Sequence, residues 1–182
     1  MPSPDTDELA PRLARVRLLL LDVDGVLTDG GITFTAAGDE AKTFHVRDGV
    51  GLKVWREAGH SVGIVTGRTS QTVARRAAEL GIVHVRQGVG EKVAAAEGIL
   101  AACGADWSET ATIGDDLPDI ALAVRAGVSF AVADACAELR AAATVVTTLP
   151  GGRGAVREAV ERLLGARGEW EAAVARYRGG VA

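Results

Sequence analysis

The chain has 182 residues, of which 48% are hydrophobic and only 4% aromatic, and its formal net charge is -4. This length suits one domain with a core of its own, and the negative charge argues against the basic surface of a nucleic-acid-binding protein. The apolar run at residues 18–21 is far too short to cross a bilayer. We therefore expect a cytoplasmic protein with neither nucleic-acid nor membrane partners.

The first strong element is an apolar strand that ends at two acids. Residues 1–15 are polar and contain three prolines, which indicates a loose leader with a short helix. Residues 18–21 are four leucines that follow Val16 and Arg17, as in a central parallel strand that is buried on both faces. Asp22 and Asp24 follow at its carboxyl end, before the turn residue Gly25. Two acids this close repel each other unless a cation or a shared proton separates them, and the segment predicts a site for a hard divalent metal ion.

A two-stranded hairpin is predicted at about residues 30–46. Turn residues at 29–31 and 37–40 each precede a short strand segment, 32–35 and 42–46, that contains β-branched and aromatic side chains. The hairpin carries Phe34 and Phe44, and an isolated hairpin is only marginally stable. It therefore needs a surface to pack against, either the body of the domain or a second subunit.

Helical and strand patterns alternate along the rest of the chain. We expect strands at residues 61–65, 82–85, 110–113, 129–132 and 144–147, and helices at 49–57, 70–80, 91–103, 120–126, 138–143 and 155–164. Residues 166–182 are expected to form a last helix or a tail. This alternation predicts an α/β fold with three layers, in which helices cover both faces of a central parallel sheet.

Several chemically complementary groups are expected at one edge of this sheet. Ligands of open parallel sheets bind where the carboxyl ends of the strands converge. Carboxylates for a cation, a hydroxyl beside backbone N–H groups, and an ammonium group are together typical of phosphoryl transfer. The groups that follow the strands or begin the intervening helix are Asp22, Asp24, Thr66, Gly67, Arg68, Lys92, Asp115, Asp116 and Asp119.

The order of these groups resembles the four motifs of the haloacid dehalogenase superfamily of phosphatases. The motifs read Asp22-Val-Asp24-Gly-Val-Leu-Thr, Thr66-Gly, Lys92 and Gly114-Asp115-Asp116-x-x-Asp119. A phosphorelay receiver domain also combines paired acids with one Thr and one Lys, but its lysine comes last, whereas here a second acid pair follows the lysine.

A closer resemblance comes from the segments between the motifs. Residues 44–49, 64–68, 132–135 and 151–158 are similar to the 3-deoxy-D-manno-octulosonate 8-phosphate phosphatase family, and the resemblance runs from about residue 16 to 164. It implies a Rossmann-like fold of the capless (C0) type with a hairpin flap, assembled as a homotetramer. The implied domains are a leader (1–15), a hydrolase domain (16–165) and a C-terminal helix or tail (166–182).

The resemblance also implies a reaction. The expected activity is Mg²⁺-dependent hydrolysis of a small phosphorylated sugar acid through an aspartyl-phosphate. Asp22 is the expected nucleophile, and Asp24 is the expected general acid and then base. Thr66, Gly67 and Lys92 are expected to hold the phosphate.

The remaining expected roles concern the metal ion and the sugar. The implied Mg²⁺ ligands are Asp22, Asp24 and Asp115, with Asp116 and Asp119 in support; the candidate sugar-binding cations are Arg47, Arg68 and Arg153. Guanidinium groups suit a substrate carboxylate because they can bind it with two hydrogen bonds.

Two alternatives remain open. The substrate can be the 9-phosphate of a nine-carbon keto-acid, or another metabolite. The domain can also be a non-catalytic module with an oligomerisation or regulatory role, although intact Asp22 and Asp24 argue against it.

Overall fold

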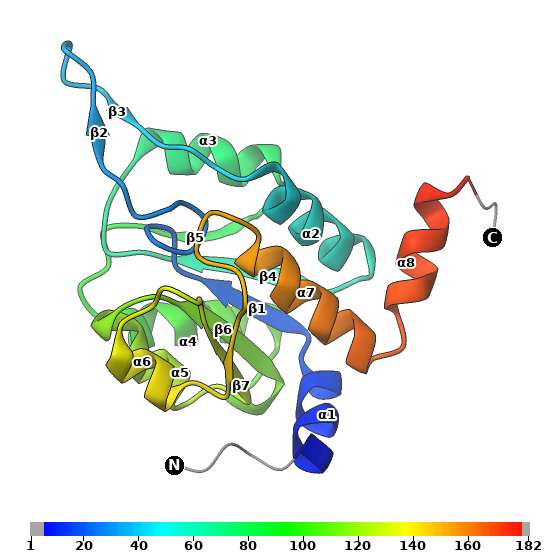
Figure 1. Ribbon diagram of the computed structural model, residues 1–182. Coiled ribbons are helices and arrows are strands. Elements are labelled where there is room, and N and C mark those ends of the chain that lie inside the picture. Colours follow the sequence, from blue (N-terminus) through cyan, green and yellow to red (C-terminus); the bar gives the residue numbers. More distant parts are fainter. Residues whose placement is uncertain (1–5, 180–182) are drawn as a thin grey trace.

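The computed structural model describes residues 6–179, and a parallel sheet with helices on both faces forms its centre (Figure 1). The six strands lie in the order β5-β4-β1-β6-β7-β8, and each neighbouring pair is parallel. Their bounds are β1 (Leu18–Leu21), β4 (Ser61–Val65), β5 (His84–Arg86), β6 (Thr110–Gly114), β7 (Val128–Ala131) and β8 (Val145–Val146). The predicted three-layer α/β fold is confirmed.

The four leucines of β1 explain why this strand is central. Their side chains alternate between the two faces of the sheet, and all four are buried. Leu19 and Leu21 belong to the larger core, which also contains residues of α1 (Thr6–Arg15), α2 (Val46–Glu57), α3 (Gln71–Glu79), α6 (Ala137–Ala142) and α7 (Ala155–Ala166). Leu18 and Leu20 pack with α4 (Lys92–Cys103) and α5 (Ile120–Ala123) on the other face.

Both ends of the described chain pack on this domain. In α1, Leu13 is buried and the Arg12 guanidinium donates hydrogen bonds of 2.9 and 2.6 Å to the Gly127 carbonyl. In α8 (Trp170–Tyr177), Ala173 is buried, and the Arg157 guanidinium lies 4.9 Å from the centre of the Trp170 ring. None of the helices within residues 6–179 combines the length and apolar character needed to span a membrane.

A buried carboxylate joins the starts of α2 and α7. The Asp48 side chain accepts hydrogen bonds from the backbone N–H groups of Gly154 (3.1 Å) and Arg157 (2.8 Å). Burial raises the pKa of Asp48, and these two donors partly oppose that rise. Asp48 thus supplies, from another helix, the acceptor that the first turn of α7 needs.

The predicted hairpin is present and projects from the body (Figure 1). Its antiparallel strands are β2 (Thr33–Phe34) and β3 (Glu40–Ala41). The second strand therefore lies just before the predicted segment 42–46, because Phe34 pairs with Glu40 and α2 already begins at Val46. Phe34 is 64% exposed, whereas Phe44 packs against the main core with the Arg76 guanidinium 5.7 Å from its ring centre. The body of the domain therefore covers Phe44, and Phe34 remains exposed in the single chain.

Some element boundaries differ from the prediction. Strand β5 begins at His84 rather than at residue 82, because the Ile82 N–H still bonds the Ala77 carbonyl at the end of α3. Helix α5 ends at Ala123 rather than at residue 126, and the short 3₁₀ turn η2 (Leu117–Asp119) precedes it. A second 3₁₀ turn, η1 (Trp107–Glu109), leads into β6.

Candidate active site

The polar ends of β1, β4 and β6 and the first turn of α4 line one open cleft of about 520 Å³. This convergence follows from the parallel sheet, since all its strands end at the same edge. The cleft contains all the predicted catalytic, metal-binding and phosphate-binding residues together with one predicted sugar-binding cation: Asp22, Asp24, Thr66, Gly67, Arg68, Lys92, Asp115, Asp116 and Asp119.

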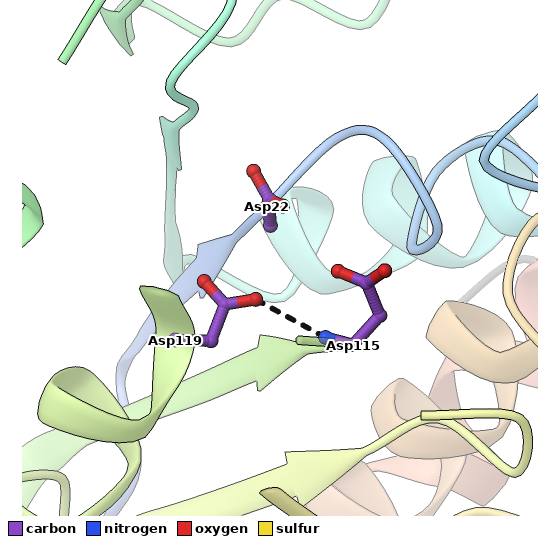
Figure 2. Close-up of side chains that lie close together, drawn as sticks. All are labelled: Asp22, Asp115 and Asp119. Atoms are coloured by element: carbon purple, nitrogen blue, oxygen red, sulfur yellow. Dashed lines mark hydrogen bonds between the residues drawn. The ribbon is translucent and has the colours of Figure 1, made fainter. Parts of the chain in front are cut away.

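Three carboxylates project toward one another in this cleft (Figure 2). Asp22 follows β1, Asp115 follows β6 and Asp119 ends η2, and one oxygen of each lies within 4.8 Å of the others. Asp119 Oδ2 accepts a hydrogen bond of 3.1 Å from the Asp115 N–H. Gly25 makes room for this arrangement, because a Cβ at that position would lie 2.0 Å from Asp115 Oδ2.

The electrostatics of this cluster fit a divalent cation. Burial, assisted by the charge of Asp119, raises the pKa of Asp22 to about 6. Burial and the charges of Asp22 and Asp119 raise the pKa of Asp115 to about 7. Asp22 Oδ1 is buried and accepts no hydrogen bond from the described residues. Crowded carboxylate oxygens, one of them without a donor, form the hard oxygen donor set that Mg²⁺ prefers.

Lys92 supplies the positive charge beside the expected nucleophile. Its Nζ donates a 2.7 Å hydrogen bond to Asp119 Oδ1 and lies 3.1 Å from Asp22 Oδ1, without the geometry of a hydrogen bond to the latter. Burial by itself would lower the pKa of Lys92, but the charges of Asp22 and Asp119 outweigh this and raise it. Lys92 is therefore an ammonium group, although its side chain is only 8% exposed.

Thr66 and Gly67 lie where β4 ends. Thr66 is buried, and its backbone donates to the Arg86 carbonyl (3.0 Å) and accepts from the Val89 N–H (3.1 Å). Gly67 is exposed beside it, and the nearest atom to a Cβ built there is the Val89 carbonyl oxygen at 3.7 Å. The backbone of Thr66 is thus fixed by two hydrogen bonds, next to the accessible backbone of Gly67.

The two acids predicted to support the metal site have different positions. Asp119 is buried and contacts both Lys92 and the Asp115 backbone. Asp116 is exposed and accepts a 2.8 Å hydrogen bond from the Leu117 N–H, so it caps the η2 turn.

Asp24 lies in a group of charged residues that the sequence analysis did not find in full. The Lys42 ammonium forms an ion pair with Asp24 Oδ1, and Arg68 Nε lies 3.7 Å from Asp24 Oδ2. Glu40 Oε1 contacts Lys42 Nζ at 3.4 Å and Arg68 Nη2 at 2.7 Å. Glu40 and Lys42 are two residues apart in the hairpin, and this spacing, which places side chains on one face of a strand, is the signal that could have identified them.

The other two predicted sugar-binding arginines are not brought to the cleft within one chain. Arg47 and Arg153 line a separate depression, together with Arg157 of α7. Arg153 Nη2 lies 3.3 Å from Asp29 Oδ2. Of the three predicted cations, the single chain places only Arg68 in the cleft.

Comparison with known proteins identifies the family of the chain. Residues 81–156 match the family described as haloacid dehalogenase-like hydrolase. The chain is 42% identical over 170 residues to 3-deoxy-D-manno-octulosonate 8-phosphate phosphatase KdsC from Yersinia pestis, covering 93% of this chain and 91% of that protein. It is 41% identical to KdsC from Escherichia coli K12, covering 93% and 90% of the two chains.

The fold agrees with solved structures of the same group. A 3-deoxy-D-manno-octulosonate 8-phosphate phosphatase from Moraxella catarrhalis, solved in complex with magnesium ion, phosphate ion and KDO, aligns with a TM-score of 0.92 and 40% identity. The alignment covers 94% of this chain and 99% of that chain. The chain therefore belongs to the 3-deoxy-D-manno-octulosonate 8-phosphate phosphatase family of haloacid dehalogenase-like hydrolases.

Proposed function

We propose that this protein is a Mg²⁺-dependent phosphatase that hydrolyses 3-deoxy-D-manno-octulosonate 8-phosphate (KDO 8-phosphate), a sugar-acid phosphomonoester, through an aspartyl-phosphate on Asp22. The observation that carries this proposal is the meeting of Asp22, Lys92 and Asp115 in one cleft, in a chain so similar to phosphatases named for that substrate. The Moraxella catarrhalis relative, solved with magnesium, phosphate and KDO, supports both the metal and the substrate class.

The first step transfers the phosphoryl group to the protein. A carboxylate oxygen of Asp22 attacks the phosphorus in line and forms an acyl phosphate bond while the bond to the sugar oxygen breaks. Asp24 donates its proton to the departing oxygen. The Lys92 ammonium compensates the negative charge of the phosphoryl oxygens. Thr66 and Gly67 hold these oxygens by hydrogen bonds.

The second step releases phosphate. Asp24, now a carboxylate, takes a proton from a water molecule as the water oxygen attacks the phosphorus. The bond between the phosphorus and Asp22 breaks, and the free enzyme returns. The carboxylates of Asp22 and Asp115 and the backbone carbonyl of Asp24 would hold Mg²⁺, which when bound supplies further positive charge to the phosphate oxygens.

Arg68 is the proposed contact for the acidic part of the sugar. It lines the cleft, and its guanidinium is 44% exposed and offers donors beyond those that face Glu40. A bidentate contact to a carboxylate suits this geometry. Arg47 and Arg153 lie outside the cleft of their own chain, and their proposed contact with the sugar acid is in the cleft of a neighbouring chain.

The experiment that tests this proposal compares the wild-type protein with Asp22→Asn. With Mg²⁺ present, the wild type should hydrolyse KDO 8-phosphate with a higher kcat/KM than the 9-phosphates of nine-carbon keto-acids. Asp22→Asn should lose more than about 1,000-fold in kcat, as expected when a covalent nucleophile is removed. Turnover that survives the substitution would overturn the mechanism, and a preference for the 9-phosphate would favour that alternative substrate. A wild type that cleaves neither would favour the non-catalytic alternative.

We also propose a homotetramer in the cytoplasm, built around one hydrolase domain at residues 16–165 with flanking segments 1–15 and 166–182. The exposed apolar side chains of Ile32 and Phe34 on the hairpin support assembly, because burying them would stabilise the complex. Within the described residues Cys103 and Cys136 are free, as in a reducing compartment. Light scattering tests the assembly, and a fully active monomer would contradict it.

A further inference from the structure

Four charged side chains around the expected acid form a closed ring of alternating charge, which we call the charge ring: Asp24, Lys42, Glu40 and Arg68. Each of the four side chains contacts two side chains of opposite charge. The ring joins three segments that are distant in the sequence: the loop after β1, the hairpin, and the loop after β4. The hairpin is thereby connected directly to a catalytic side chain.

The two cations of the charge ring differ in burial. The Lys42 side chain is fully buried, whereas that of Arg68 is 44% exposed. Water screens a half-exposed pair strongly, so the 3.7 Å contact of Arg68 with Asp24 contributes little to the position of the carboxylate. A buried ammonium group interacts with its partner in a lower dielectric, where the attraction is stronger. Lys42 is therefore the side chain that determines where the Asp24 carboxyl group lies.

We infer that Lys42 is a positioning residue for the chemical step, which holds the Asp24 carboxyl group for proton transfer and stabilises the negative charge that forms on it. This inference rests on the proposed function, in which Asp24 is the general acid. In the first step the proton of Asp24 moves to the sugar oxygen as the P–O bond breaks, and the carboxylate left behind faces the Lys42 ammonium. In the second step this carboxylate takes a proton from water.

The position of Lys42 in the sequence connects the expected acid to the hairpin. Lys42 directly follows β3, and Glu40 lies within it, so the charge ring exists only while the base of the hairpin stays against the body from which its tip projects. A hairpin that moved away would withdraw the ammonium from Asp24. Alignment of the acid is thus coupled to the conformation of the hairpin.

The leaving group provides a selective test. A sugar alkoxide is a poor leaving group and needs a proton as it departs, whereas 4-nitrophenolate is stable as an anion and departs without one. The ratio kcat/KM covers only the steps up to release of the alcohol, so it reports the first step alone. Lys42→Met should therefore lower kcat/KM for KDO 8-phosphate by at least about 10-fold, a fraction of what general acid catalysis contributes. For 4-nitrophenyl phosphate we expect a change of less than about threefold, because that departure needs little acid.

Three control variants separate positioning from a merely structural role. Lys42→Arg keeps the cation and should recover most of the lost kcat/KM for KDO 8-phosphate. Glu40→Gln weakens the hairpin contacts to Lys42 and Arg68 but leaves the ion pair of Lys42 with Asp24, so it should lower kcat/KM for KDO 8-phosphate less than Lys42→Met does. Lys53→Gln replaces an exposed lysine of α2 and should match the wild type.

A double-mutant comparison asks whether Lys42 acts through Asp24. In an Asp24→Asn background, the further change Lys42→Met should have no additional effect on kcat/KM for KDO 8-phosphate. The ratio of the two substrates in one preparation does not depend on the fraction of folded protein, so partial unfolding cannot imitate the expected result.

The inference is overturned if Lys42→Met lowers kcat/KM equally for both substrates, or for neither, or if its full effect persists with Asp24→Asn. If the Lys42 inference fails in this way while Asp22→Asn is inactive in the same assays, the phosphatase proposal remains intact. If Asp22→Asn remains active, the proposed function itself fails, so the two failures are distinguishable. Should another alkyl phosphate of the substrate panel replace KDO 8-phosphate as the preferred substrate, the same comparison applies to it.

Discussion

Acidification should weaken Mg²⁺ binding steeply, because the ion must displace protons from two carboxyl groups of the cleft. The pKa of Asp115 is raised to about 7 and that of Asp22 to about 6. At pH 6 only about a tenth of Asp115 is ionised, so the apparent affinity should be about tenfold below its limit at high pH from this group alone. At pH 5 protonation of both groups should reduce it on the order of 1,000-fold.

The same shifts determine how the stability of the metal-free protein depends on pH. Both pKa values are higher in the folded protein than the ordinary 3.8, so the folded state retains protons that the unfolded chain releases. The stability that Asp22 and Asp115 contribute is complete below about pH 4 and is lost as the pH rises through 6 to 7. Mg²⁺ should therefore raise Tm far more at pH 8 than at pH 5.

Isothermal titration with MgCl₂ at pH 8, 7, 6 and 5, with melting curves on the same samples, measures both effects. Asp115→Asn should remove most of the binding at every pH. Asp39→Asn is the matched control, because its carboxylate is exposed on the hairpin turn and lies outside the cleft, so the pH profile should keep its shape. A Kd that changes by less than about threefold between pH 8 and pH 5 would refute the reasoning, since titration of even one ligand predicts more.

Two further substitutions test the structure around the site. Gly25→Ala should weaken Mg²⁺ binding at least tenfold, roughly the effect of disturbing a metal ligand, because the new Cβ would lie 2.0 Å from Asp115 Oδ2. Gly38→Ala is the control, since it introduces the same backbone strain at a similar positive φ but in open space. This variant should bind Mg²⁺ normally. Asp48→Ala should destabilise the protein by about 2 kcal/mol, because two backbone N–H groups at the start of α7 lose their buried acceptor. Chemical denaturation measures this loss, with the exposed Glu57→Ala of the same helix as control; equal stability of the two variants would show that Asp48 is dispensable.

Much of the fold could be predicted because its signals are local. The run of leucines at 18–21 is typical of a strand buried on both faces in a parallel sheet, and the alternation of strand and helix segments favours crossover helices. Boundaries were less predictable where a cap decides them, as at Ile82, whose N–H still belongs to the end of α3. Hydrophobicity does not reveal which carbonyl such an N–H will bond.

By itself, the sequence determined the α/β class and the groups that meet at the sheet edge, because parallel strands must end together and Asp22, Thr66 and Asp115 directly follow three of them. Only the tertiary structure decided the partners of charged residues on connecting segments: Lys42 is buried against Asp24, while Arg153 faces Asp29 away from the cleft. The physical reason is that the effect of a charge depends on its distance from other charges and on its burial. Neither quantity exists until the hairpin and loops have folded onto the sheet.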